Sequence, residues 1–353
     1  MRRIDIQEAK PGMVLARDIM TYTGMILLSR NVVLTQSYIA KLEAMQVSTL
    51  CVIDPLYEGI EETEYISIEM QQQALSILHQ TMSDLKNKGT FSVKLLSNMA
   101  SDLVEELLSQ ADISICLTGI FSHDDTTFSH SLNCAIYAIL LGRFSDLTVP
   151  QLKELACGAL LHDVGKNEIS LDLLNKPEKL TEEEFELLKN HAQWGFNSLR
   201  KMRWELSSLS AHMAWQHHER IDGTGYPRGL KGDEILQYAR ILAIADVYDA
   251  ITANRPYRRA MPPKQAYDII YKGLGVHFDQ ALGQRFLSRV ALYAPGTMVV
   301  LNTGQSALVV SVPFDAPSKP VIRIITDQEG KVCSPHEISL KDTPLLKIMY
   351  CKT

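Results

Sequence analysis

Histidines are concentrated in the middle of this chain, beside apolar sequence that must be buried. Seven of the ten histidines fall between residues 123 and 218. His162 and Asp163 directly follow the apolar run 155–161, and Lys166 comes three residues after Asp163. A fold that buries this run must also bury an imidazole and a carboxylate, and both groups need polar partners there. We therefore expect a helical fold in which several such polar groups converge.

Composition limits the class of protein. A length of 353 residues exceeds one typical domain, so two or three domains are expected. A net charge of −6 argues against a DNA or RNA polymer as partner. The six cysteines lack C-x-x-C spacing and favour reduced thiols. With no signal peptide and no apolar segment long enough for a membrane span, we expect a soluble, cytoplasmic protein.

The hydrophobic period changes along the chain and predicts four parts. Residues 1–60 mix strand-like runs with a helix and predict a small regulatory α/β module of unknown function. Residues 61–111 predict a helical connector. Residues 112–293 are almost wholly helical in pattern, and residues 294–353 switch to the period of strands. The expected fold class is multidomain α+β, in which an all-α catalytic domain is flanked by the α/β module and a C-terminal β cap.

Local signals place several elements within these parts. A helix is predicted over 37–45 and a strand over 50–53. Thr181-x-x-Glu184 is a capping box that predicts the start of a helix. The two helices of 64–111 are expected either to form a homodimer surface or to pack on their own domain.

Five histidines stand beside apolar helical sequence and invite a common explanation. One such histidine is usually a satisfied core residue, but five together favour convergence on a shared ligand. Asp246 interrupts the apolar run 241–245 and also needs a cation, either a metal or an arginine such as Arg240 or Arg255. A mixed imidazole and carboxylate set suits iron, manganese, zinc or cobalt better than magnesium or calcium. The five histidines are His130, His162, His191, His217 and His218.

Two further motifs lie near these candidates. Gly223, Gly225 and Pro227 impose an ordered loop after the histidine pair, which either shapes substrate access or only ends a helix. Arg255 and Arg258 suit bidentate contact with phosphate, and their alternative is a solvated charge cluster.

Taken in order, these separated motifs resemble the HD-GYP family of bacterial cyclic di-GMP phosphodiesterases, which belong to the HD metal-dependent phosphohydrolases. The resemblance covers about residues 115–290. It implies an HD-type helical catalytic domain that hydrolyses cyclic di-GMP to pGpG, and further to GMP, in second-messenger signalling. The motifs are His162-Asp163-x-Gly165-Lys166, His191, His217-His218-Glu219-x-x-Asp222-Gly223-x-Gly225-Tyr226-Pro227, Asp246-x-Tyr248-Asp249 and Arg255-Pro256-Tyr257-Arg258.

The resemblance also assigns roles. Asp163 would bridge two metal ions and share catalysis with Lys166, which would lie by the scissile phosphate. The first ion would be held by His130, His162, Asp163 and Asp246, and the second by Asp163, His191, His217 and His218. Substrate contacts would come from Lys166, Asp222, Gly223, Gly225, Tyr226, Pro227, Arg255 and Arg258.

The number and kind of metal ions follow from the same comparison. Some family members bind a third metal through a glutamate one helical turn before the first histidine, where this chain has Thr126. We therefore expect two divalent ions. Iron and manganese are the preferred metals, and zinc, cobalt and nickel are the alternatives.

Two other functions remain open. One is an HD phosphohydrolase acting on another nucleotide, such as a mixed cyclic dinucleotide or a guanosine alarmone. The other is a cyclic di-GMP receptor without significant turnover, which signals through the N-terminal module. The complete ligand set and Lys166 favour the enzyme.

Overall fold

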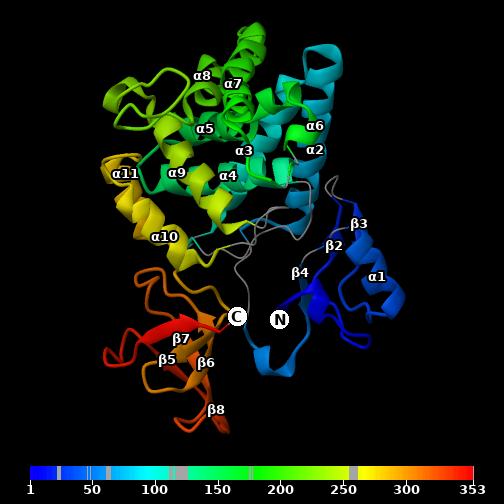
Figure 1. Cartoon of the computed structure of the whole chain (residues 1–353), viewed down its shortest axis with the longest axis vertical. Coiled ribbons are helices and arrows are strands. Elements are labelled where there is room, and N and C mark those ends of the chain that lie inside the picture. The colour runs from blue at the N-terminus through cyan, green and yellow to red at the C-terminus, as the bar shows by residue number, and fades with distance from the viewer. Residues whose placement is uncertain are drawn as a thin grey trace.

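Three bodies of different character follow one another along the chain (Figure 1). The computed structural model describes residues 1–21, 25–45, 47, 49–60, 65–110, 114–115, 126–174, 176, 178–253 and 261–352. A small strand-containing module comes first, a large helical body follows, and a five-stranded sheet ends the described chain. This arrangement confirms the predicted fold class.

The N-terminal module is built from two strand pairs and one helix around its own apolar core. Strand β1 (Arg2–Asp5) pairs antiparallel with β4 (Thr49–Val52), and β2 (Ile19–Met20) pairs with β3 (Ile26–Leu28). Helix α1 (Gln36–Ala44) confirms the predicted helix, and β4 confirms the predicted strand. The core contains Ile4, Leu15, Leu34, Leu42 and Leu50.

The helical body contains ten α-helices within the described residues. Helix α4 lies at its centre, and residues 131–142 of this helix are buried on every side. A helix that is apolar all round is stable only when other helices surround it, and α2, α3, α5 and α9 pack against α4. The ten are α2 (Ile68–Lys88), α3 (Val93–Ser109), α4 (Thr126–Arg143), α5 (Val149–Leu161), α6 (Leu171–Leu174), α7 (Glu182–Leu199), α8 (Ser208–Gln216), α9 (Gln237–Thr252), α10 (Pro263–Lys272) and α11 (Gln280–Leu287).

The predicted connector helices belong to the same core as the rest of the helical body. Leu78 of α2 and Leu103 of α3 are fully buried in one apolar cluster with residues of α4 and α5. The apolar faces of the two helices therefore pack within the chain, which is the alternative to a dimer surface given above. The domain boundaries and the homodimer through 64–111 stay predictions. In the described part of the chain, every helix is too short or too polar to cross a bilayer.

The C-terminal sheet is antiparallel, with the strand order β8-β7-β6-β5-β9. It confirms the predicted switch to a period of two, since Val309 packs on one face and Leu308 on the other. The strands are β5 (Met298–Leu301), β6 (Ser306–Ser311), β7 (Val321–Thr326), β8 (Val332–Ser339) and β9 (Ile348–Cys351).

The two small modules contact each other, which the sequence did not predict. Tyr57 and Ile60 pack in one buried cluster with Leu308 and Ile325 of the C-terminal sheet. Arg323 donates hydrogen bonds to the carbonyl oxygens of residues 56 and 58, at 3.3 and 2.7 Å. The module and the sheet are therefore held together beside the helical body, as the lower half of Figure 1 shows.

A close approach between two segments fixes part of the helical body. A Cβ atom on Gly165 would lie 1.9 Å from the carbonyl oxygen of His191 and 2.6 Å from the backbone nitrogen of Gly195. Gly165 is the second residue of the short helix η3 (Val164–Glu168), which begins directly after Asp163. The absence of a side chain at residue 165 therefore lets α7 approach Asp163.

Gly165→Ala is expected to lower the stability of the helical body by about 1–3 kcal/mol or more, because α7 must move away from η3. Gly195→Ala is the matched control on the same contact, since its Cβ would meet no atom closer than 3.4 Å. Thermal unfolding followed by circular dichroism measures both variants. Equal melting temperatures for the two variants would contradict the role given to Gly165.

Candidate metal centre

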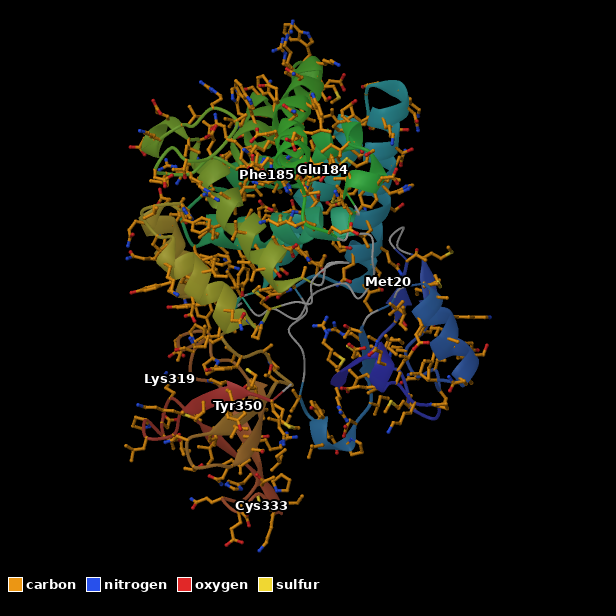
Figure 2. All side chains as sticks on the ribbon, viewed as in Figure 1. Met20, Glu184, Phe185, Lys319, Cys333 and Tyr350 are labelled. Atoms are coloured by element: carbon orange, nitrogen blue, oxygen red, sulfur yellow. The ribbon has the colours of Figure 1, made fainter. Side chains whose placement is uncertain are left out.

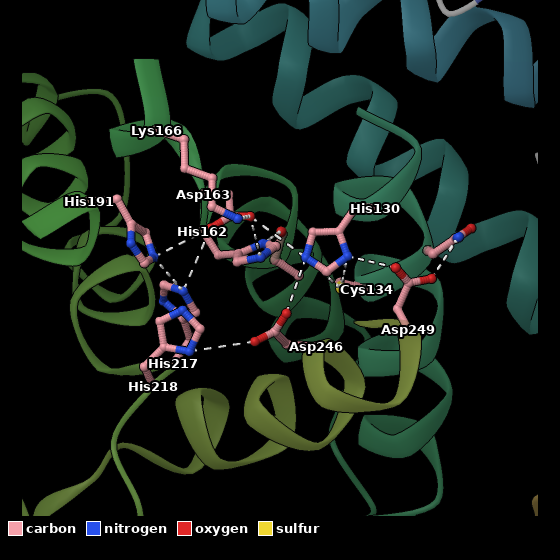
Figure 3. Close-up of polar contacts among 12 residues, drawn as sticks. His130, Cys134, His162, Asp163, Lys166, His191, His217, His218, Asp246 and Asp249 are labelled. Atoms are coloured by element: carbon pink, nitrogen blue, oxygen red, sulfur yellow. Dashed lines mark hydrogen bonds and ion pairs between the residues drawn. The ribbon is translucent and has the colours of Figure 1, made fainter. Parts of the chain in front are cut away.

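Five helices bring the predicted metal ligands together in the middle of the helical body (Figure 3). One histidine lies on α4, another on α7, and an aspartate on α9. Two dipeptides lie just beyond the last residues of α5 and α8. The structure therefore brings together all seven predicted metal ligands: His130, His162, Asp163, His191, His217, His218 and Asp246.

Three of the imidazoles share one orientation. The Nδ1 atoms of His162, His191 and His217 lie 2.7, 2.7 and 3.0 Å from the carbonyl oxygen three residues earlier in the chain. A carbonyl oxygen only accepts hydrogen bonds, so each Nδ1 carries the proton and donates it. Each Nε2 atom therefore presents a lone pair, the form of imidazole that binds metal.

These lone pairs lie unusually close to one another. The Nε2 atoms of His191 and His217 are 3.3 Å apart. The buried Nε2 of His162 and Oδ1 of Asp163 have no hydrogen-bond partner among the described residues. Unpartnered buried acceptors are costly, and cations bound among these atoms would satisfy them.

The carboxylate of Asp163 lies between two pairs of imidazoles. Its Oδ2 is 3.6 Å from Nε2 of His130 and 3.4 Å from Nε2 of His162. Its Oδ1 is 3.5 Å from Nε2 of His191 and 3.8 Å from Nε2 of His217. Each oxygen thus faces a different pair, which is the arrangement that a carboxylate bridging two ions requires.

Asp246 also contacts imidazoles of both predicted metal sites. Its Oδ1 lies 3.1 Å from Nε2 of His130, and its Oδ2 lies 3.6 Å from Nδ1 of His218. His130, His162 and Asp246, together with Cys134, offer ligand atoms that all lie within 4.8 Å of one another. A second group contains His191, His217 and His218, whose ligand atoms also lie within 4.8 Å of one another.

The alternative of an ion pair between Asp246 and Arg240 is wrong. The guanidinium of Arg240 instead contacts Asp233 at 3.0 Å and Asp279 at 2.8 Å. Arg255, the other arginine considered, lies outside the described residues. Within the described chain, the ion-pair contacts of Asp246 are therefore with imidazoles.

Burial sets the protonation state of the site. It lowers the pKa of His162, His191 and His217, and it lowers the pKa of His218 to about 3. Burial opposes ionisation of Asp163, but Lys166 and the imidazoles outweigh it and hold the pKa of the carboxyl well below its usual value. At neutral pH these imidazoles are neutral and the carboxylate is charged, as metal ligands must be.

His130 and Asp246 behave as a pair. Burial raises the pKa of the Asp246 carboxyl, but the hydrogen bond from His130 outweighs it and lowers the pKa well below its usual value. Burial alone would lower the pKa of His130, but Cys134, Asp246 and Asp249 together raise it well above its usual value. A cation at this position would replace the proton on Nε2 of His130.

The donor set fits the predicted ions. Neutral imidazole nitrogens and carboxylate oxygens, arranged in two groups around one shared carboxylate, suit iron, manganese, zinc or cobalt. Hard ions such as magnesium and calcium prefer all-oxygen sites. The residues therefore fit divalent transition-metal ions.

Lys166 lies beside the shared carboxylate. Its ammonium contacts Oδ2 of Asp163, and its side chain is partly exposed. Because Lys166 belongs to η3, the same turn positions both the carboxylate and the positive charge. The ammonium therefore lies at the rim of the buried imidazole cluster.

The glycine-rich loop places one aromatic ring at the cluster. The ring of Tyr226 lies 4.7 Å from the ring of His218, between centroids. The loop can pass close to the histidine pair because Gly225 has no side chain. A Cβ at this residue would lie 2.5 Å from the carbonyl oxygen of His218. Gly223 has a φ of 84°, a conformation that favours glycine. Burial raises the pKa of Tyr226, so its hydroxyl remains protonated.

Other predicted substrate contacts are less directly placed. The carboxylate of Asp222 accepts hydrogen bonds from the backbone nitrogen and hydroxyl of Thr224, at 2.9 and 2.7 Å, and so it stabilises its own loop. Pro227 is exposed. Arg255 and Arg258 lie outside the described residues, so their roles stay predictions. Thr126 is the first residue of α4, and its side chain is outside the described part.

Several residues that position the site were given no role in the sequence analysis. Asp249 accepts a hydrogen bond from Nδ1 of His130 at 2.6 Å and another from Asn133 at 2.8 Å, and this fixes the imidazole. The signal for Asp249 was its position three residues after Asp246 on an apolar helix, since such residues share a face. Cys134 packs against His130, with its sulfur 3.5 Å from Nδ1.

Glu219 is a buried carboxylate directly after the histidine pair. It accepts hydrogen bonds from the backbone nitrogens of Arg228 and Leu230, at 2.8 and 3.0 Å. It therefore anchors the far end of the glycine-rich loop to the end of α8. The signal for it was a charged residue next to two candidate ligands.

Comparisons with known proteins agree with this geometry. A model of the HD domain matches residues 94–282, and a model of the KOW domain associated with the HD domain matches residues 298–351. Bd1817, an HDG"Y"P protein from Bdellovibrio bacteriovorus, has a similar fold, with a TM-score of 0.50 and 14% identity. That match covers 81% of this chain and 97% of Bd1817.

Two curated relatives are more similar in sequence. The cyclic di-GMP phosphodiesterase PA4108 of Pseudomonas aeruginosa is 35% identical over 243 residues, which are 68% of this chain and 58% of that protein. The 3'3'-cGAMP-specific phosphodiesterase 3 of Vibrio cholerae is 42% identical over 153 residues, which are 43% of this chain and 33% of that protein. The chain thus matches less than two thirds of the length of either relative. Its matched residues and the order of its motifs show that the chain belongs to the HD domain family and, within it, to the HD-GYP group.

Proposed function

We propose that this chain is a metal-dependent phosphodiesterase that hydrolyses cyclic di-GMP to pGpG, with GMP as a further product. The observation that carries the proposal is the carboxylate of Asp163, whose two oxygens face two different pairs of imidazoles. Such a shared carboxylate suits two ions held side by side, and two ions suit an in-line displacement at phosphorus. The similarity to the phosphodiesterase PA4108 supports this choice of reaction.

We propose iron or manganese as the resident ions, two for each chain. The imidazole-rich donor set favours these over magnesium and calcium. Bound ions of this kind activate water as a nucleophile and neutralise charge on the phosphate. The other tasks fall to the side chains of the protein, which orient the ligand and handle the leaving group.

Lys166 is the residue best placed to act on the leaving group. Hydrolysis joins a water oxygen to phosphorus and breaks the bond to one ribose oxygen, which must gain a proton. The ammonium of Lys166 lies at the shared carboxylate, partly open to solvent. There it would stabilise the charge that develops on that oxygen or supply the proton.

The substrate contacts would come from the rim of the cluster. Tyr226 lies against His218, so its ring would border the bound phosphate. Gly223 and Gly225 shape the loop that carries this ring, with Asp222 and Pro227 on the same loop. Arg255 and Arg258 would add positive charge for the phosphates.

A second candidate substrate is a mixed cyclic dinucleotide. The similarity to the 3'3'-cGAMP-specific phosphodiesterase 3, at 42% identity over the matched part, favours this alternative. The metal ligands do not distinguish the two substrates, because they would contact only the phosphate that both share. Discrimination would depend on residues that contact the bases.

Product analysis tests the reaction. Protein loaded with manganese, or with iron under anaerobic conditions, is expected to convert cyclic di-GMP to pGpG. Chromatography of the products over time, run in parallel with 3'3'-cGAMP, gives kcat/KM for each substrate. A higher value for 3'3'-cGAMP would support the second candidate. Binding of cyclic di-GMP without pGpG or GMP would identify a receptor and end the enzyme hypothesis.

Loss of a predicted ligand is expected to empty the metal centre. Asp163→Asn keeps the volume of the side chain but removes the charge that both sides share, so it should lose most of the bound metal and the turnover. His162→Ala should do the same. Asp233→Asn is the control, since that carboxylate is exposed and pairs with Arg240. Elemental analysis of each purified variant measures the bound metal. Full metal content in Asp163→Asn would contradict the bridging role.

Lys166→Met is expected to keep its metal and to lower kcat about 100-fold, as loss of one group that stabilises developing charge usually does. Lys166→Arg keeps the positive charge and should retain more activity. Steady-state kinetics combined with elemental analysis separates the two effects. An unchanged kcat in Lys166→Met would remove this residue from the mechanism.

A further inference from the structure

An exposed aromatic ring lies close to the loop that carries Tyr226. Phe185, near the start of α7, is 45% exposed. Figure 2 places it on the helical body, away from the labelled residues of the C-terminal sheet. A single exposed phenylalanine has no special meaning, so the argument depends on what surrounds it.

A series of rings connects Phe185 with the metal centre. The ring of Phe185 lies 6.5 Å from that of Tyr226, edge to face. The ring of Tyr226 lies 4.7 Å from that of His218 and 6.4 Å from that of His191. The exposed ring is therefore one aromatic neighbour away from two candidate metal ligands.

A positive charge accompanies the two aromatic rings. The ammonium of Lys189 lies 4.9 Å from the ring centre of Phe185 and 5.6 Å from that of Tyr226. Its ion-pair partner is Glu186, which is largely exposed, so solvent weakens that pair. An aromatic surface together with a positive charge is the combination that binds a nucleotide base and its phosphate.

The helix end that holds Phe185 is well fixed. Thr181 and Glu184 form a capping box at the start of α7, with bonds of 2.8 and 3.2 Å. Lys176 pairs with Glu184 at 2.6 Å. Phe185 therefore belongs to a preorganised helix and not to a loop that must be ordered on binding.

We propose that Phe185 and Lys189 extend the site into a subsite for one purine base of the ligand. The base stacks on the exposed part of the Phe185 ring, and Lys189 contacts the adjoining phosphate. This inference rests on the proposed function, because it takes the ligand to be a cyclic dinucleotide whose phosphate lies at the metal centre. It gives α7 a second task besides carrying His191.

Equilibrium binding separates base recognition from phosphate recognition. Manganese-loaded protein is titrated in a calorimeter with GMP and, separately, with ribose 5-phosphate, which has no base. Wild type is expected to bind GMP about tenfold tighter or more, as stacking on one aromatic ring provides. Phe185→Ala should remove most of this preference and leave the affinity for ribose 5-phosphate unchanged. It should also raise KM for cyclic di-GMP about tenfold, with kcat changed much less.

Two further variants keep the test decisive. Phe185→Leu keeps an apolar side chain without the ring and should lose the preference while retaining the melting temperature of wild type. Leu187→Ala, an exposed apolar residue on the same helix, is the matched control and should keep the preference. The subsite would be overturned if Phe185→Ala lowered the affinity for GMP and for ribose 5-phosphate equally, or lowered neither. It would also be overturned if wild type did not bind GMP more tightly than ribose 5-phosphate. If wild type fails to cleave cyclic di-GMP, the proposed reaction fails, but the comparison of GMP with ribose 5-phosphate still decides the subsite.

Discussion

Lone pairs that face one another inside an apolar helical body are the constraint on which the rest of this structure depends. The Nε2 atoms of His191 and His217 lie 3.3 Å apart, and the oxygens of Asp163 lie within 4 Å of four imidazoles. Such an arrangement is unfavourable without cations, because each group has lost its hydration and gained another acceptor as neighbour. The helical body is therefore built for positive charge at its centre, and binding of metal ions would contribute to its stability as well as to its chemistry.

The ends of helices do much of the work of orienting these groups. His162 follows the last residue of α5 and His217 follows that of α8, and each donates its Nδ1 proton to a carbonyl of the turn before it. The last carbonyls of a helix lack partners within the helix, so these bonds satisfy the helix and select the imidazole tautomer together. Asp249, on the neighbouring helix α9, fixes the orientation of His130 by accepting a hydrogen bond from its Nδ1. The tautomers are thus fixed by the fold before any ion binds.

Much of this centre could be predicted from the sequence, because a buried polar residue in an apolar run stands out without knowledge of the fold. Asp246 is recognisable in this way, as is His162 beside Asp163. The contribution of Asp249 was harder to predict, because its hydrogen bond joins it to His130, which lies 119 residues earlier in the chain. Phe185 gave no signal, since an exposed phenylalanine in a helical pattern is ordinary. The contact of Tyr57 with the C-terminal sheet was equally hidden, because it depends on how separate modules pack.

The centre and its rim are under different physical constraints. Most of the predicted metal ligands are buried, and several are also held by a hydrogen bond within the helical body, so a change there disturbs several bonds at once. Phe185 and Lys189 are partly exposed on one face of α7, and their replacement would leave those bonds intact. Contacts with a base can therefore change while the chemistry at the phosphate is kept. Such independence would allow one kind of helical body to serve proteins named for cyclic di-GMP and for 3'3'-cGAMP, both of which are similar to this chain. The selectivity of this chain would then be decided at the rim near α7 and the glycine-rich loop, and not by the ligands of the metals.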